Sequence, residues 1–497
     1  MIFKNTRFFV LFFATLAFGN YAYGQQEFTL YHMPSLAQST YLNPAVVPEH
    51  KVSISLPVPS LFVGFNNSSI NVKALMSPDG TVDYNKFVEG LKENKNYLGA
   101  GVSGELFHIR VKAADNFFSL SSRVIADARV HYPRDLFALA SKGVTGNFSL
   151  SGLAIDATSY IEYAAGFTRV RPDSKWTYGA RIKWLNGLAN IQTKNTEIDV
   201  NVNGEDIYSY DITAKGLVNI GAALDGNKYK TLDDLSNLEI NSFKDALNEF
   251  KPNNGIATDL GATFQFTEKL SFGASLLNLG FINWKNFVNN YQIDTHFVVE
   301  GVTAEVDFDT NLDSLFNAQV DSLVQAYGDQ FKEGVDTTFN SYKTWLPTQL
   351  FLSANYQITP KFNATASVYT EFHKGVSVGT VVGANYRFGN TFDLTASWWW
   401  FNRSASNLGI GMVFKPWFGQ IYIIMDNVLP GGLVKVSDPE LEINNLWLPY
   451  GAKNFNLRAG INLVFGKIRE ANRLPMNGLT KKKDGKRKYL YKPPFKH

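Results

Sequence analysis

The chain has 497 residues, 45% of them hydrophobic, and a formal net charge of +3. It contains no cysteine, which excludes disulfide bonds, thiolate chemistry and a lipoprotein anchor. The small net charge hides an asymmetry, because residues 467–497 carry eleven basic side chains against only two acidic ones.

The N-terminus predicts export. Lys4 and Arg7 precede an apolar run over residues 8–18, and Ala22-Tyr23-Gly24 offers small residues to a signal peptidase. Residues 1–24 are therefore expected to form a signal peptide. No other stretch approaches the ~18–20 consecutive apolar residues of a membrane helix, so an exported chain with membrane character requires a β-barrel in the outer membrane.

Residues 25–50 predict an extended, turn-rich lead-in that is neither strand nor helix, because Pro34 and Pro44 interrupt it and no regular period persists. The first strand candidate is residues 51–65. It contains Pro57 and Pro59, which predict a kink or an edge-like segment.

Hairpins, strands and loops follow. Further strands are predicted over residues 98–113, 117–130, 160–169, 176–185, 189–202, 256–266 and 270–279. Short helices are predicted at residues 87–93 and after Pro133. Residues 225–251 predict a long external loop. Residues 312–331 predict an amphipathic loop helix that covers the barrel mouth or enters the lumen.

Residues 347–465 show the clearest pattern, with apolar residues on alternate positions, a short polar turn, and alternation again. Strands of roughly 9–13 residues with one apolar face match the ~9–11 residues that cross a bilayer obliquely. A sheet in lipid must close, because an open edge would leave backbone groups unpaired. We predict an all-β transmembrane antiparallel barrel over residues 51–466, with about 14 strands (about 12–16) and short helices in its loops. A soluble sandwich is the alternative.

The alternation in the last predicted strand predicts which way its side chains face. Ala459, Ile461 and Leu463 are predicted to face lipid and Asn462 the lumen, so Ile461→Arg should do far more damage than Asn462→Arg. Short periplasmic turns are predicted at Pro172, Glu268, Pro360 and Gly389.

The inward phase of the strands carries both charge signs and several aromatic rings. The lumen-facing candidates are Arg181, Lys183, Asp259, Phe351, Asn355, Glu371, Arg387, Asp393, Trp399 and Arg458, with Phe401, Lys415 and Trp417. The charges would either close the lumen through salt bridges and water or line a translocation route. The aromatic residues would either hold an apolar ligand or pack against an inserted loop.

The tail, residues 467–497, is predicted to be extended and periplasmic, because its like charges repel. The basic cluster is Lys481, Lys482, Lys483, Lys486, Arg487 and Lys488. In an exported protein this cluster favours outer-membrane lipid, peptidoglycan carboxylates or an acidic periplasmic or secretion-system protein over nucleic acid. A solvated tail without a partner is the alternative.

The chain offers no catalytic pattern. Its seven histidines lack metal-ligand spacing, and neither a Gly-x-Ser-x-Gly elbow nor a phosphate-binding glycine loop occurs. We expect no enzyme and no catalytic, cofactor or metal site. A barrel hydrolase that joins Ser, His and Asn from different strands stays open as an alternative.

Several stretches resemble an uncharacterised outer-membrane β-barrel family of the Bacteroidota. They are residues 31–34 (YHMP), 38–45 (QSTYLNPA), 132–137 (YPRDLF), 179–190 (GARIKWLNGLAN) and 346–348 (LPT). The Asn278-Leu279-Gly280 segment and the general layout are also similar to FadL-type fatty acid transporters and to the PorV barrel of the type IX secretion system. The first resemblance implies an outer-membrane barrel and no particular ligand.

Two functions follow from these patterns. One is a FadL-like passage for small or hydrophobic solutes, with a possible hydrophobic ligand. The other is a non-catalytic barrel subunit that binds a secretion, assembly or surface-anchoring partner. An open lumen would favour passage, and a plugged lumen would favour partner binding.

Overall fold

The fold is taken from a computed structural model of the chain. It describes residues 27–55, 60–68, 84–94, 96–139, 145–171, 174–204, 209–224, 250–300, 334–373, 375–401, 404–428, 433–438, 443–449, 454–468, 480–483 and 486–489. The predicted signal peptide, the turn at Pro172 and most of the predicted loop segments 225–251 and 312–331 lie outside these residues.

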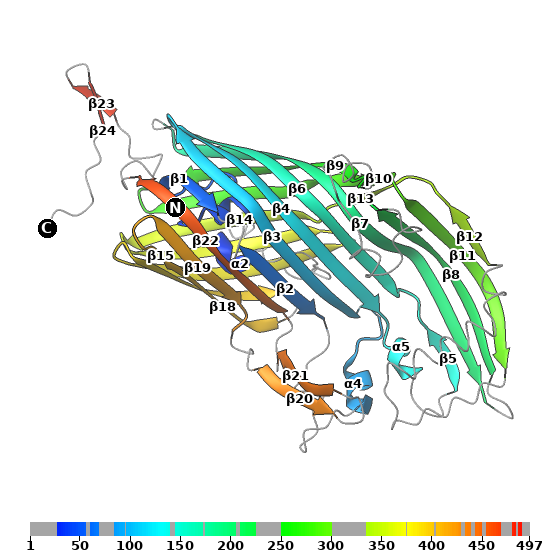
Figure 1. Cartoon of the computed structure of the whole chain (residues 1–497). Coiled ribbons are helices and arrows are strands. Elements are labelled where there is room, and N and C mark those ends of the chain that lie inside the picture. The colour runs from blue at the N-terminus through cyan, green and yellow to red at the C-terminus, as the bar shows by residue number, and fades with distance from the viewer. Residues whose placement is uncertain are drawn as a thin grey trace, which may run out of the picture.

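The main feature is a closed antiparallel barrel of 14 strands, which confirms the predicted fold class (Figure 1). Its strands are β1 (His50–Ser55) with β2 (Leu61–Asn67), β3 (Asn96–Ala113), β4 (Asn116–Tyr132), β6 (Ala154–Val170), β7 (Trp176–Asn203), β9 (Asn253–Gln265), β10 (Leu270–Trp284), β14 (Thr348–Thr359), β15 (Phe362–Phe372), β16 (Val376–Phe388), β17 (Phe392–Phe401), β18 (Ser404–Phe414), β19 (Gly419–Asp426) and β22 (Asn454–Lys467).

The last strand closes the sheet. β22 pairs with β19 on one side and with β1 and β2 on the other. β1 and β2 together form the first barrel strand, because both pair with β22 and with β3. Pro57 and Pro59, from which a kink or an edge-like segment is predicted, lie outside the described residues.

The sheet continues beyond the barrel along β7, which has 28 residues. Its first half pairs with β6 and β9, and its second half pairs with β8 (Ser209–Ala222) and β5 (Gly146–Ser149). β11 (Val288–Glu300) and β12 (Val335–Thr338) extend this part, and β13 (Tyr342–Trp345) pairs with β10. The two strands predicted over residues 176–185 and 189–202 are therefore one strand. Different neighbouring strands pair with its two halves.

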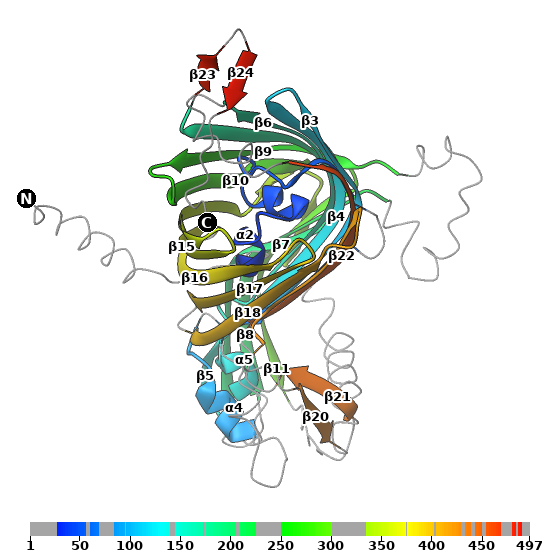
Figure 2. The same ribbon diagram turned by 90° about the vertical axis from the view of Figure 1, so that its left-hand side faces the viewer.

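The two ends of the barrel differ. Short connections, including the predicted turns at Glu268, Pro360 and Gly389, lie at the end where His50 pairs with Lys467. The opposite end carries α4 (Tyr84–Gly90), α5 (Asp135–Ala138) and the hairpin of β20 (Leu433–Asp438) and β21 (Ile443–Pro449) (Figures 1 and 2). None of the described helices is long and apolar enough to cross a membrane.

The basic tail is not wholly extended, contrary to the prediction. β23 (Thr480–Lys483) and β24 (Lys486–Tyr489) form a small hairpin that is separate from the barrel (Figure 1). In its register Lys481 is the partner of Lys488.

The outer face of the barrel is apolar. Along β22, the side chains on the phase of Leu457, Ala459 and Ile461 are partly exposed, whereas Arg458 and Asn462 on the other phase are buried. Aromatic rings gather at the short-turn end, where Trp176 packs against neighbouring rings. This alternation, with aromatic residues near a strand end, is typical of a barrel that faces lipid.

The outer phase of β22 yields a depth-dependent prediction. Ile461→Arg in mid-strand should lower the free energy of unfolding by about 2–4 kcal/mol, whereas Phe465→Arg at the strand end should cost about 0–1 kcal/mol. Equilibrium unfolding of the purified protein in lipid vesicles measures both values. Equal losses at the two positions would mean that this face does not lie against hydrocarbon.

Candidate functional site: a lumen filled by the N-terminal segment

Residues 27–49, here called the lumen segment, lie inside the barrel, as the blue elements in Figure 2 show. The segment contains the short helix α2 (Phe28–Tyr31) and the 3-10 helix η1 (Ala37–Tyr41). The expectation of a lead-in without helix is therefore wrong. The short helical turns satisfy backbone groups locally where no neighbouring strand pairs with them, for example where the His32 amide donates to the Thr29 carbonyl.

Aromatic side chains of the wall hold the lumen segment. The Phe28 ring lies 5.2 Å from that of Tyr369, 5.0 Å from that of Trp399 and 5.7 Å from that of Phe401. All four side chains are buried. Edge-on and tilted contacts of this kind contribute about 0.5–1.5 kcal/mol each beyond burial.

A second aromatic contact lies beside the first. The Tyr31 ring stacks on Phe351, with centroids 4.6 Å apart and planes 12° from parallel. Of the two roles considered for the lumen aromatics, packing against an inserted segment is the one that Phe351 takes. Trp417 is 98% exposed in the turn before β19, so its predicted inward orientation is wrong. It follows the last residue of β18, where strand alternation no longer applies.

Polar side chains of the wall also bind the backbone of the lumen segment. They come from β19, β10, β6 and β3, so the segment is held on several sides. The contacts are Asp426 Oδ1 with the Thr29 amide (3.3 Å), Gln420 Nε2 with the Ser35 carbonyl (3.0 Å), Ser275 Oγ with the Leu42 carbonyl (2.6 Å), Thr168 Oγ1 with the Pro44 carbonyl (2.6 Å) and Arg110 with the Val46 carbonyl (2.8 Å).

Wall glycines make room for this close approach. A Cβ atom at Gly179 would lie 2.1 Å from the Pro44 carbonyl oxygen, and one at Gly261 would lie 2.3 Å from Asn43 Oδ1. Gly179 and Gly261 are cross-strand partners in β7 and β9. The two glycines therefore form a smooth patch of wall that only a residue without a side chain can provide.

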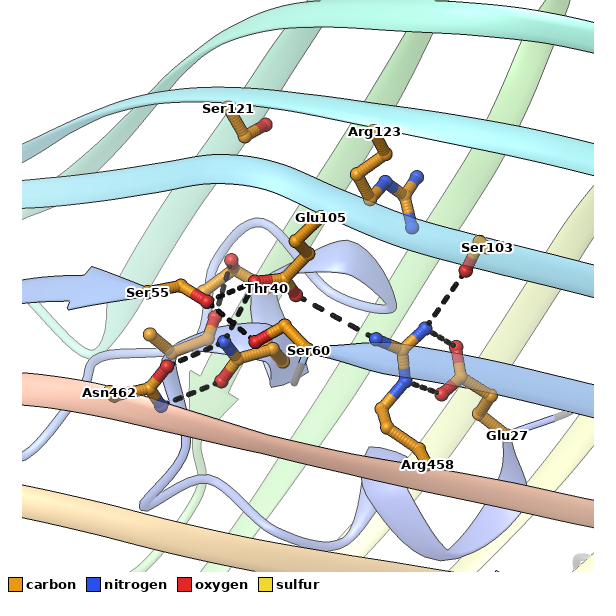
Figure 3. Close-up of polar contacts among 12 residues, drawn as sticks. Glu27, Thr40, Ser55, Ser60, Ser103, Glu105, Ser121, Arg123, Arg458 and Asn462 are labelled. Carbon is orange, nitrogen blue, oxygen red and sulfur yellow. Dashed lines mark hydrogen bonds and ion pairs between the residues drawn. The ribbon is translucent and has the colours of Figure 1, made fainter. Parts of the chain in front are cut away.

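Charged side chains tie one end of the lumen segment to β22 (Figure 3). Arg458 forms a bidentate ion pair with Glu27 and lies 3.7 Å from Glu105. Nearby, Gln38 and Asn462 exchange two amide hydrogen bonds of 2.8 and 2.9 Å. The contact with Gln38 changes the expectation for Asn462→Arg, because the larger side chain would displace Gln38 from the wall.

A second charged cluster crosses β4, β6, β7 and β9. Glu162 accepts hydrogen bonds from Arg123 at 2.8 Å and from Arg181 at 3.0 Å. Asp259 pairs with Arg181 at 2.9 Å and with Lys183 at 2.7 Å. All five side chains are buried, and breaking such a network leaves an uncompensated charge that costs about 3–5 kcal/mol.

This cluster also contacts the lumen segment, through Tyr41. The Tyr41 ring lies between the guanidinium carbons of Arg123, at 4.1 Å, and Arg181, at 4.9 Å. A bulge in β10 places Asn278 at a positive φ of 59°, from which its amide donates to Asp259 and its side-chain oxygen accepts from Lys183. Cation–π contact with two guanidinium groups favours one position of the Tyr41 ring.

A third cluster lies near the short-turn end. Glu49 pairs with Arg387 at 2.6 Å and with Lys415 at 3.0 Å, and Asp393 also contacts Lys415. Two carboxylates and two cations thus balance each other. On β15, buried Glu371 accepts hydrogen bonds from Tyr369 and from Gln349.

The lumen candidates predicted from the sequence are therefore brought together in several places instead of one site. The sequence analysis missed Arg123, Glu162, Glu105 and Asp426, which complete the clusters. The alternation of residues 117–130 and 160–169 could have placed Arg123 and Glu162 on the inward phase. No group of three or more metal-ligating side chains occurs among the described residues.

Two cavities flank the lumen segment. The larger, of about 280 Å³, lies between the lumen segment and β9, β10, β14, β15 and β16 at the short-turn end. The smaller, of about 120 Å³, touches Glu27, Tyr41 and Leu42 on its other side and reaches Gln192 and His373. The lumen segment lies between them.

The glycine patch yields a prediction about the lumen segment. Gly179→Val should leave the barrel folded but expel residues 43–45, because the new side chain would overlap the Pro44 carbonyl. Hydrogen–deuterium exchange of residues 27–49 should then increase. Gly104→Val on β3 is the matched control, since no atom lies within 4 Å of a Cβ there. Unchanged protection in the Gly179 variant would contradict the observed packing.

Comparison with known proteins gives a family and a set of similar barrels. The family model of unknown function DUF5723 matches residues 44–426. None of the curated proteins matches the chain. Among solved structures, the toluene transporter TbuX of Ralstonia pickettii is similar over 87% of this chain and 94% of its own, with 10% identity and a TM-score of 0.39.

A second similar structure is a FadL homologue of Pseudomonas aeruginosa. It covers 88% of this chain and 95% of its own, with 9% identity and a TM-score of 0.39. The origin in the Bacteroidota and the likeness to PorV stay predictions. With most of its barrel matched by the family model, the chain belongs to the family of unknown function DUF5723.

Proposed function

We propose that the protein is an outer-membrane passage for small solutes and that the lumen segment is its gate. The observation that carries the proposal is the pair of cavities, which meet the lumen segment from opposite ends of one barrel. A filled lumen by itself favours the partner-binding alternative, but removal of the lumen segment from between the two cavities would join the two spaces. The apolar outer face and closed sheet support a place in the outer membrane, where barrels of this class lie.

The contacts of the lumen segment favour a movable gate rather than a fixed strand of the wall. Its backbone is bound through wall side chains, such as Gln420 and Ser275, and it joins the strand ladder only at its last residue, where the Glu49 carbonyl accepts from the Ile468 amide. Side-chain contacts of this type contribute about 0.5–1.5 kcal/mol each, so they can be exchanged one by one. A strand of the wall, by contrast, could move only if all of its backbone hydrogen bonds to the neighbouring strands broke.

A disulfide lock tests the gate. Thr29 Oγ1 of α2 lies 2.7 Å from Ser397 Oγ of β17, and the chain has no cysteine of its own. In the double variant Thr29→Cys/Ser397→Cys, oxidation should bond the two sulfurs and stop swelling of liposomes by small solutes, and reduction should restore it. The single variants T29C and S397C, treated with the same oxidant, are the controls.

Two outcomes of this measurement would count against the passage. One is equal swelling rates for the oxidised and reduced double variant. The other is the absence of swelling in the reduced double variant, the single variants and the natural chain alike. A barrel subunit for a secretion, assembly or anchoring partner would then be the better proposal.

We also propose that the basic tail binds an anionic surface. In the hairpin of β23 and β24, Lys482 is the partner of Arg487 and Lys483 of Lys486, so the basic residues are concentrated in one short hairpin. The end of β22 places the tail beyond the short-turn end of the barrel. Each basic residue near an anionic lipid surface contributes about 1 kcal/mol.

Salt dependence tests the tail. Binding of the full chain to vesicles with anionic lipid should exceed that of a chain truncated after Ile468, and the difference should vanish as salt shortens the Debye length from ~10 Å at 0.1 M to ~3 Å at 1 M. Neutral vesicles are the control. Equal binding of the two chains at low salt would leave the tail a solvated appendage.

A further inference from the structure

About half of the residues that line the larger cavity have uncharged polar side chains. Cross-strand pairing aligns Gln357 of β14, Asn363 of β15 and Asn385 of β16 in one row. The next row joins Asn355 to Thr365. Three neighbouring strands thus present amide and hydroxyl groups to the same space.

The charged groups near this cavity neutralise each other. Glu49 and Arg387 line it and form an ion pair at 2.6 Å, and Lys415 and Asp393 complete the balance. His32 is an imidazole, a group that is mostly neutral at pH 7. Lys269, in an exposed turn, is the remaining charged side chain of the lining.

We propose that this cavity binds an uncharged solute with several hydroxyl groups, of about the size of a monosaccharide, and the proposal rests on the passage proposed above. Amide side chains both donate and accept hydrogen bonds, as hydroxyl groups do, whereas a site for an ion offers mainly one kind of partner. A volume of about 280 Å³ lies just below the range of about 300–1,000 Å³ for small-molecule pockets.

Two further observations favour this class over an apolar solute. Among the described residues, Asn355 Oδ1 and Thr365 Oγ1 are buried without a hydrogen-bond partner, so the second row keeps unused capacity. The wall aromatics that could hold a hydrocarbon, such as Phe351 and Trp399, are covered by Tyr31 and Phe28. A hydrocarbon in the cavity would offer no hydrogen bond to the amide groups of Gln357 and Asn363.

Binding and flux are measured separately with three probes: glucose, its charged analogue glucuronate, and toluene. Saturation-transfer NMR on the full chain in detergent measures binding, and liposome assays measure flux. Glucose should bind about tenfold more tightly than either other probe, the change expected when one or more hydrogen bonds to a buried group are unmade.

Two variants at the amide row, Gln357→Leu and Asn363→Leu, should each weaken glucose binding about tenfold. Gln192→Leu is the matched control, because Gln192 lines the smaller cavity on the other side of the lumen segment. Heat-modifiable gel migration identifies preparations of each variant that contain the folded barrel.

The outcomes separate this inference from the proposed passage. Tighter binding of toluene or glucuronate, binding of none of the three probes, or equal glucose binding by the amide-row variants and Gln192→Leu would overturn the inference. Toluene flux without glucose binding would overturn it and leave the passage intact. Glucose binding without flux of any probe would support it and overturn the passage.

Discussion

The structure depends on one constraint: a polypeptide can occupy the lumen of a closed barrel only if its buried polar groups find partners there. The lumen segment meets this constraint with two short helical turns and with side chains from four wall strands. The wall has glycine, which lacks a side chain, where the backbone of the lumen segment comes closest to it, at Gly179 and Gly261. Wall and segment are therefore complementary in shape as well as in hydrogen bonding.

The two kinds of contact have different consequences. Aromatic packing of Phe28 against Tyr369, Trp399 and Phe401 fixes the position of α2 without using hydrogen bonds. The charged clusters contact η1 and the ends of the lumen segment through Tyr41, Glu27 and Glu49. Each cluster contains both carboxylates and cations, so its charges are compensated locally.

Much of the fold could be predicted from the sequence, because strand alternation with period 2 reports directly which face is buried. It predicted the barrel of about 14 strands and the buried positions of Arg181, Lys183 and Arg458. It failed at Trp417, where the strand has ended. Nor could it place residues 27–49, since a segment without a period carries no signal of what will surround it.

The same limit explains why the contacts between the side chains of the lumen could not be predicted. Residues such as Arg123 and Glu162 lie on predicted strands, but their pairing depends on which strands are neighbours across the sheet. The role of the wall aromatics depended on whether something filled the lumen, and both answers were compatible with the sequence. Register and lumen contents are long-range properties, and local patterns determine neither.

The central claim is that residues 27–49 fill the lumen. The most direct measurement is a cryo-electron microscopy density map of the protein in a lipid nanodisc, at a resolution that shows aromatic side chains. The account predicts density for Phe28 between Tyr369, Trp399 and Phe401, and for Tyr41 between Arg123 and Arg181. A well-resolved barrel with residues 27–49 outside its lumen would contradict it.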